Sequence, residues 1–63
     1  MKDAEALFRF ETQLYPLSWN AFDSLAETLA SLGKKADAKR AYRRAYALNP
    51  KDIAALDAVH ALP

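Results

Sequence analysis

The feature of this sequence that most constrains its fold is an internal repeat with a period of 34 residues, the interval between Pro16 and Pro50. When the chain is shifted by this interval, side chains of similar character fall on one another. The matched pairs are Ala4 with Ala38, Phe8 with Tyr42, Leu14 with Leu48, Trp19 with Ile53, Phe22 with Leu56 and Leu25 with Val59. A fixed period of this length is typical of chains built from stacked helix–turn–helix units.

Prolines and a single glycine divide the chain into four segments in which apolar residues recur every three or four positions. This spacing predicts helices, and no segment shows the two-residue alternation of a strand. We expect helices near 2–14, 18–32, 35–48 and 51–61. Ser18 should cap the second helix, and Gly33 should end it in a left-handed conformation. Asn49 should cap the fourth helix, with Asp52 three residues later as in a capping box.

The length of 63 residues allows one domain, 1–63, with a small core. Its predicted core members are Phe8, Leu14, Trp19, Phe22, Leu25, Leu29, Tyr42, Ala45, Leu48 and Leu56. The chain has no cysteine, which excludes disulfides and thiolate metal sites. We expect no signal peptide in this chain and no membrane span, and the sequence indicates no compartment.

Charge is segregated along the chain although the net charge is only +1. Residues 33–50 carry six basic side chains against one acidic, whereas 17–32 carry two acidic side chains and no basic one. Lys35, Lys39 and Arg43 recur every four residues, and we expect them to form the basic outer face of a helix. Nucleic acid is a minor alternative for this row, because we see no aromatic stacking platform among the basic residues and the pI is only about 8.1.

The sequence favours a protein that is not an enzyme. Its one histidine, His60, lies on a predicted apolar helix, where a packing or capping role is the ordinary one. Asp23 and Glu27 are one helical turn apart, a spacing more often found on a solvated face than in an acid–base pair. With Gly33 as the only glycine, no phosphate-binding loop is present, and no cluster has metal-ligand spacing. We therefore expect no catalytic residues, cofactor or metal.

The central unit resembles the tetratricopeptide repeat, a family whose pattern alternates small and bulky apolar positions before a proline. The residues that carry the resemblance are Phe22, Leu25, Ala26, Leu29, Gly33, Ala38, Tyr42, Ala45 and Pro50. Ala26 replaces the usual glycine and Leu29 the usual aromatic residue. The resemblance implies an all-α, antiparallel helix–turn–helix solenoid fragment of about four helices. It assigns one full repeat to 19–52, a helix of a preceding half-repeat to 2–14 and a capping helix to 53–63.

The resemblance to this family implies a non-catalytic protein–protein interaction or scaffolding module that binds on its concave side. The residues expected on that side are Asn20, Asp23, Glu27 and Asp57. Because three of these are acidic and like charges repel, we expect a basic or neutral protein or peptide partner there.

Two other interpretations remain open. The stretch from 7 to 32 resembles helical tails that follow the catalytic domain in some bacterial serine hydrolases of the β-lactamase type. The chain would then be the C-terminal tail of a larger bacterial protein, with a structural role and the parent polypeptide as its partner. A homodimer formed through the open repeat ends is compatible with either interpretation, because repeat units bury their cores against neighbours.

Overall fold

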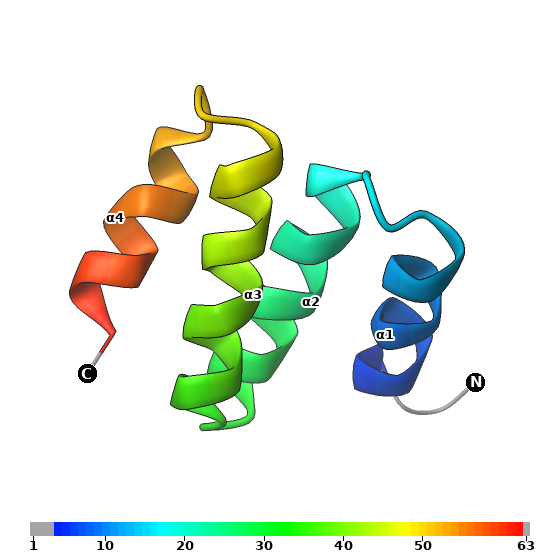
Figure 1. The fold of residues 1–63 in the computed structure, drawn as a ribbon. Helices are drawn as coiled ribbons and strands as arrows, with labels where there is room; N and C mark the ends of the chain where they lie inside the picture. Colours follow the sequence, from blue (N-terminus) through cyan, green and yellow to red (C-terminus); the bar gives the residue numbers. More distant parts are fainter. Residues whose placement is uncertain (1–3, 63) are drawn as a thin grey trace.

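The computed structural model describes residues 4–62 and shows four helices (Figure 1). They are α1 (Ala4–Leu14), α2 (Trp19–Ser31), α3 (Lys35–Leu48) and α4 (Ile53–Ala61). Within these residues there is no strand, so the predicted all-α class is confirmed. Residues 2, 3 and 63, which belong to the predicted outer segments, lie outside the described residues.

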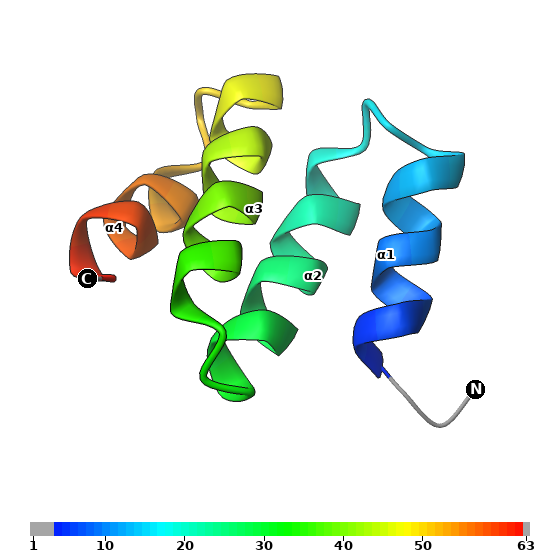
Figure 2. The same ribbon diagram turned by 60° about the horizontal axis from the view of Figure 1, so that its bottom comes forward.

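The helices form a flattened stack of 30 × 25 × 13 Å in which each helix packs against its neighbour in the sequence (Figures 1 and 2). The most extensive interface joins α2 and α3, with α1 beside α2 and α4 beside α3. Short turns make successive helices antiparallel. The predicted solenoid arrangement is therefore confirmed, with one complete helix pair at the centre and a single helix on each side.

Both ends of α2 follow the local sequence signals. The Ser18 side chain accepts a hydrogen bond from the backbone N–H of Ala21 at 3.4 Å, as predicted for an N-cap. Gly33 has a φ of +81°, the left-handed region that favours glycine. The backbone N–H of Gly33 donates to Ala30 and that of Lys34 to Leu29, which is the Schellman arrangement. These caps satisfy backbone groups that the helix leaves unpaired.

The predicted start of α4 was wrong. Asn49 does not cap this helix, because its side chain accepts a hydrogen bond from the backbone N–H of Lys51 inside the turn. The backbone N–H of Asp52 donates to the Asn49 carbonyl, which closes the turn before the helix begins. Asp52 is itself the N-cap, and its Oδ1 accepts from the backbone N–H of Ala55 at 3.1 Å. The helix therefore begins at Ile53 rather than near 51.

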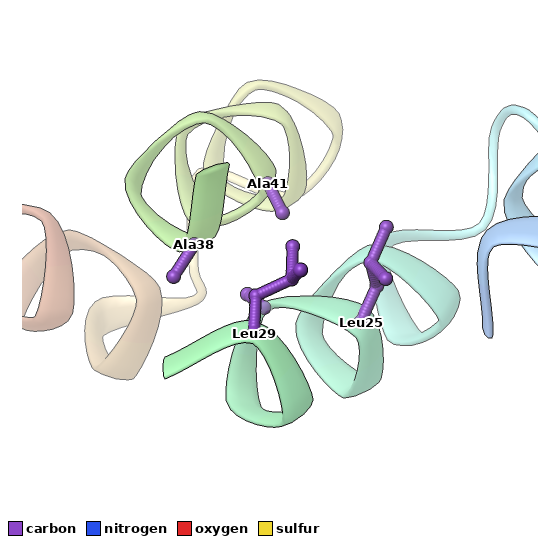
Figure 3. Packing of buried hydrophobic residues seen from close by; sticks show 5 residues of the cluster. Leu25, Leu29, Ala38 and Ala41 are labelled. Atoms are coloured by element: carbon purple, nitrogen blue, oxygen red, sulfur yellow. The ribbon is translucent and has the colours of Figure 1, made fainter. Parts of the chain in front are cut away.

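The core lies between α2 and α3 and is built from alternating large and small side chains (Figure 3). Leu29 of α2 points toward Ala41 of α3 and is only 1% exposed, and Leu25 and Ala38 belong to the same buried cluster. Alanine allows the two helix backbones to approach closely, and the leucines fill the remaining space. Burying an apolar side chain of this size stabilises the fold by about 1.5–3 kcal/mol.

The predicted core is correct at its centre and wrong at its edge. Leu25, Leu29 and Ala45 are buried, and a further group is half-buried, namely Phe8, Phe22, Tyr42, Leu48 and Leu56. Leu14 and Trp19 are exposed. Leu14 lies on α1, which has a neighbour on only one side, and Trp19 is the first residue of α2. Ala26 and Ala38, which the repeat pattern predicted as packing positions, are buried, whereas the buried alanines at positions 21, 41 and 55 were absent from the predicted core.

Candidate functional site

The candidate site is a pocket of about 260 Å³ lined by Asp23 and Glu27 of α2, Tyr42 of α3 and Ala54 of α4. We refer to it as the acidic pocket. The turn of α2 that begins at Asp23 supplies both carboxyl groups, because residues four apart lie on one face of a helix. The stacking of α4 on α3 then brings Ala54 to the opposite wall.

The structure brings together only two of the four residues predicted on the concave side. Asp23 and Glu27 line the acidic pocket, whereas Asn20 and Asp57 do not. Asn20, Glu27 and Asp57 are exposed, whereas Asp23 is half-buried. Asn20 lies one helical turn before Asp23, and Asp57 lies one turn after Ala54. These two exposed residues therefore extend the surface along both helices beyond the pocket.

Asp23 differs from the expectation of a solvated carboxylate. Its side chain is half-buried, and its Oδ1 atom is fully buried without a hydrogen-bond partner. The second acid involved is Asp52, a residue that the sequence pattern placed in the first turn of the fourth helix, as part of a capping box. It is only 9% exposed, and its Oδ2 atom is also buried and unpartnered. Its position directly after an Asn-Pro-Lys turn is the signal that could have identified it as an N-cap.

The electrostatics of the acidic pocket disfavour further negative charge. Burial raises the pKa of Asp23 to about 7, helped by the hydrogen bond that the protonated Asp23 carboxyl can donate to Asp52 and by the charges of Asp52 and Glu27. Burial also raises the pKa of the Tyr42 phenol, with smaller contributions from the charges of Glu27, Asp23 and Asp52. The pocket therefore has acceptors in excess of donors, which is the environment that a proton or a cationic group stabilises.

The chemistry available here is recognition of charge. Among residues 4–62 there is no group of three or more His, Cys, Asp and Glu side chains that could hold a metal ion. His60 is exposed on α4, away from the residues that line the pocket. None of the four described helices is both long and apolar enough to cross a bilayer.

The predicted basic outer face lies on α3. Lys35 and Arg43 are exposed there, and Lys39 is half-buried. The neighbouring basic residues Arg40 and Arg44 lie elsewhere, in a second pocket of about 200 Å³ between α1, α2 and α3.

The arginines of this second pocket have partners within the fold. The Arg44 guanidinium lies 5.9 Å from the ring centroid of Phe22, within the range of a cation–π contact. Arg40 pairs with Asp37, and Arg9 of α1 approaches the same carboxylate at 3.9 Å. These basic side chains stabilise the stack.

Ion pairs that the sequence did not reveal attach α1 to the rest of the stack. Lys34, in the turn after α2, donates to Glu5 at 2.6 Å, and Arg9 donates to the same carboxylate at 2.9 Å. The hydrogen bonds from Lys34 and then Arg9 lower the pKa of Glu5. Residues 5 and 34 are far apart in sequence, so only the packing of α1 on α2 brings them together.

Comparison with known proteins agrees with this geometry. Residues 19–62, which include the complete α2–α3 pair and α4, match the family described as tetratricopeptide repeat. No curated protein and no solved structure matches the chain.

Proposed function

The chain belongs to the tetratricopeptide repeat family, and on that premise we propose that it is a non-catalytic module that binds a basic segment of a protein or peptide partner. Repeats of this family generally mediate protein–protein interactions and are generally non-catalytic. The proposed organisation is one full repeat, 19–52, preceded by a half-repeat helix and followed by a capping helix.

The observation that carries this proposal is the acidic pocket between α2 and α4. In the family, the first helix of each pair lines the partner-binding side, and α2 and α4 hold that position here. The pocket walls carry Asp23 and Glu27, while the exposed Asn20 and Asp57 extend the same surface. Complementary charge raises association rates and excludes partners of the wrong sign, so this surface should select a basic segment.

Titration of paired peptides tests the proposal. One peptide is Lys-rich and the other ends in acidic residues, and each is measured at low and moderate salt. We expect the Lys-rich peptide to bind more tightly, with an affinity that falls as salt rises because exposed charges are screened.

Glu27→Gln should weaken that binding, whereas Lys35→Gln on the basic outer face is the matched control and should not. Preference for the acidic peptide, lost when Asp23 and Glu27 are replaced by alanine, would show that the assignment is wrong.

A second role is favoured by the apolar surface at the two ends of the stack. On α1, Leu7, Phe10 and Leu14 are 40%, 53% and 54% exposed, and on α4 Ile53 is 57% exposed. Exposed apolar residues that cluster on one face often mark an interface. We propose that these ends are covered either by a second copy, as a homodimer, or by the parent polypeptide of a larger enzyme of which the chain is an accessory tail.

Two measurements distinguish a homodimer from a tail that packs against its parent polypeptide. Sedimentation velocity of the chain at rising concentration should show a dimer in the first case and a monomer in the second. In the second case the parent open reading frame should also encode a catalytic domain before residue 1.

A further inference from the structure

The two outer helices of the stack are related to the two inner ones by the 34-residue repeat. When the chain is shifted by this interval, α1 falls on α3 and α2 falls on α4. The contacts follow the same rule, because α1 lies beside α2 as α3 lies beside α4 (Figure 2). Among residues 4–62, however, α1 has no counterpart of α2 on its other side, and α4 has no counterpart of α3.

The face of α1 that stays open is the one that α3 uses to contact α2. On α3, Ala41 is buried in the cluster shared with α2 (Figure 3), and the Arg44 guanidinium lies over the Phe22 ring of α2. The repeat places Leu7 and Phe10 of α1 at the positions of these two α3 residues. Both are exposed, so α1 presents an apolar stripe where a helix of the α2 type would pack.

The composition of α4 is that of a helix with neighbours on both sides. Seven of its nine residues are apolar, and only Asp57 and His60 are polar. A helix that is apolar on every side is normally covered on every side. Val59 occupies the repeat position of Leu25, yet Val59 is half-buried whereas Leu25 is buried. Leu25 has α3 packed over it, and α4 lacks such a second neighbour within the described residues.

We propose that these two faces bind each other between copies of the chain, so that α4 of one copy and α1 of the next form a helix pair of the α2–α3 kind. This inference rests on the proposed covering of the open ends by a second copy, and it specifies which faces meet. Head-to-tail contact is favoured because α1 needs a helix of the α2 type, which the repeat supplies as α4. Two α1 faces packed on each other would leave α4 uncovered.

The side chains of the new pair complement one another in size. In the α2–α3 core, the large Leu25 accompanies the small Ala41. At the equivalent positions the α4–α1 pair has Val59 and Leu7, so the larger side chain changes helix and the total volume is similar. Cores tolerate exchanges of this kind when the total volume and the pattern are kept.

A second contact becomes fully apolar in the new pair. The Arg44–Phe22 contact between α3 and α2 is replaced by Phe10 and Leu56 at the equivalent positions of α1 and α4. Phe10 is exposed and Leu56 is half-buried in the single chain. Their contact would remove apolar surface from water without burying a charge, which favours association.

Two polar residues determine the spacing of the helices. His60 stands at the repeat position of Ala26, and Glu11 at that of Ala45, where both alanines are fully buried. The axes of α4 and α1 must therefore lie further apart than those of α2 and α3. Such a contact between two short helices buries less than the roughly 800 Å² per partner of a standard interface, so we expect weak association, with a Kd on the order of 10⁻⁴ M.

Head-to-tail contact does not close after two copies. A pair of copies still presents a free α1 face at one end and a free α4 face at the other. Assembly therefore continues to trimers and longer chains unless the rotation between copies closes a ring, whereas a dimer with a two-fold axis stops at two copies. The size distribution distinguishes these arrangements.

Sedimentation velocity of the full chain, from about 10 μM to about 1 mM, measures this distribution. We expect the average mass to rise past that of a dimer without a plateau there. Phe10→Glu blocks the α1 face and His60→Glu blocks the α4 face, because burying an unpaired carboxylate is costly. Each variant alone should remain monomeric. Both residues are exposed in the single chain, and circular dichroism verifies that the variants are helical.

Mixing the two variants tests the pairing itself. Phe10→Glu retains an intact α4 face and His60→Glu an intact α1 face, so the mixture should form a dimer with one copy of each variant and grow no further. A two-fold dimer through α1 predicts instead that His60→Glu assembles like the wild type. Leu17→Glu, which changes an exposed apolar residue in the turn between α1 and α2, is the matched control and should assemble normally.

The outcomes separate the head-to-tail contact from the self-association on which it rests. A wild type that stops at a dimer, a mixture that stays monomeric, or a His60→Glu variant that assembles like the wild type overturns the contact between α4 and α1. The first of these results leaves self-association in place. A wild type that is monomeric at every concentration overturns self-association as well, and the binding of the Lys-rich peptide is measured independently of both.

Discussion

The pH dependence of stability is the most direct test of the Asp23–Asp52 pair, because it requires no partner. The pKa of Asp23 is raised from 3.8 to about 7 in the folded chain. The folded state therefore keeps a proton that the unfolded chain loses near pH 4. This contribution to stability is fully present below the unfolded pKa and is lost as pH rises through 7. Stability should accordingly fall between about pH 5.5 and about pH 8.5.

The size of this loss in unfolding free energy follows from the pKa of Asp23 in the unfolded chain, 3.8, and in the folded chain, about 7. For a single group with these pKa values, the linkage relation gives a loss of about 2 kcal/mol over that interval. Asp23 is only half-buried, so solvent screens the charges around it, and we expect about 1 kcal/mol. In a domain of this size, about 1 kcal/mol corresponds to a fall in Tm of about 4–8 °C.

The assay is thermal unfolding followed by circular dichroism for the wild type, Asp23→Asn and Asp57→Asn. The neutral amide in Asp23→Asn cannot titrate, so its Tm should stay nearly constant and should exceed that of the wild type near pH 8.5. Asp57→Asn, which changes an exposed acid on α4, should follow the wild-type curve. A wild-type Tm that is constant or rises over this interval, or an equal slope in Asp23→Asn, would refute the buried carboxyl pair.

Three further predictions concern the fold and its open end. Leu29→Ala should destabilise the chain by about 2–5 kcal/mol in urea unfolding, because this 1% exposed side chain fills the α2–α3 core; a cost no larger than that of exposed Leu32→Ala would contradict this packing. Gly33→Ala should cost about 1–2 kcal/mol through backbone strain alone, since no atom lies within 4 Å of an added Cβ; an unchanged Tm would show that the turn relaxes. Phe10→Glu should abolish any concentration-dependent association seen by sedimentation, and a variant that associates like the wild type would exclude the α1 face as the interface.

The repeat sequence itself determined most of the architecture. The 34-residue period, the apolar spacing of three and four, Ser18 and Gly33 predicted four stacked helices and both ends of α2. These features could be predicted because each depends on residues within one or two helical turns of one another. Helix periodicity, capping and left-handed glycine are local properties. A repeated sequence carries the same local pattern in both copies, so the same local structure is expected in each.

The features that distinguish this chain depend on its tertiary structure. Asp23 and Asp52 are 29 positions apart in sequence, and the packing of α2, α3 and α4 decides that a carboxylate oxygen of each is buried without a donor. In the same way, Leu14 is exposed although its repeat partner Leu48 is half-buried, because α1 has a neighbour on one side only. Burial and pKa depend on which groups exclude water from a given atom. Periodicity specifies the face of a helix, whereas the helices packed around that face decide whether a carboxyl group on it is solvated or is buried with a raised pKa.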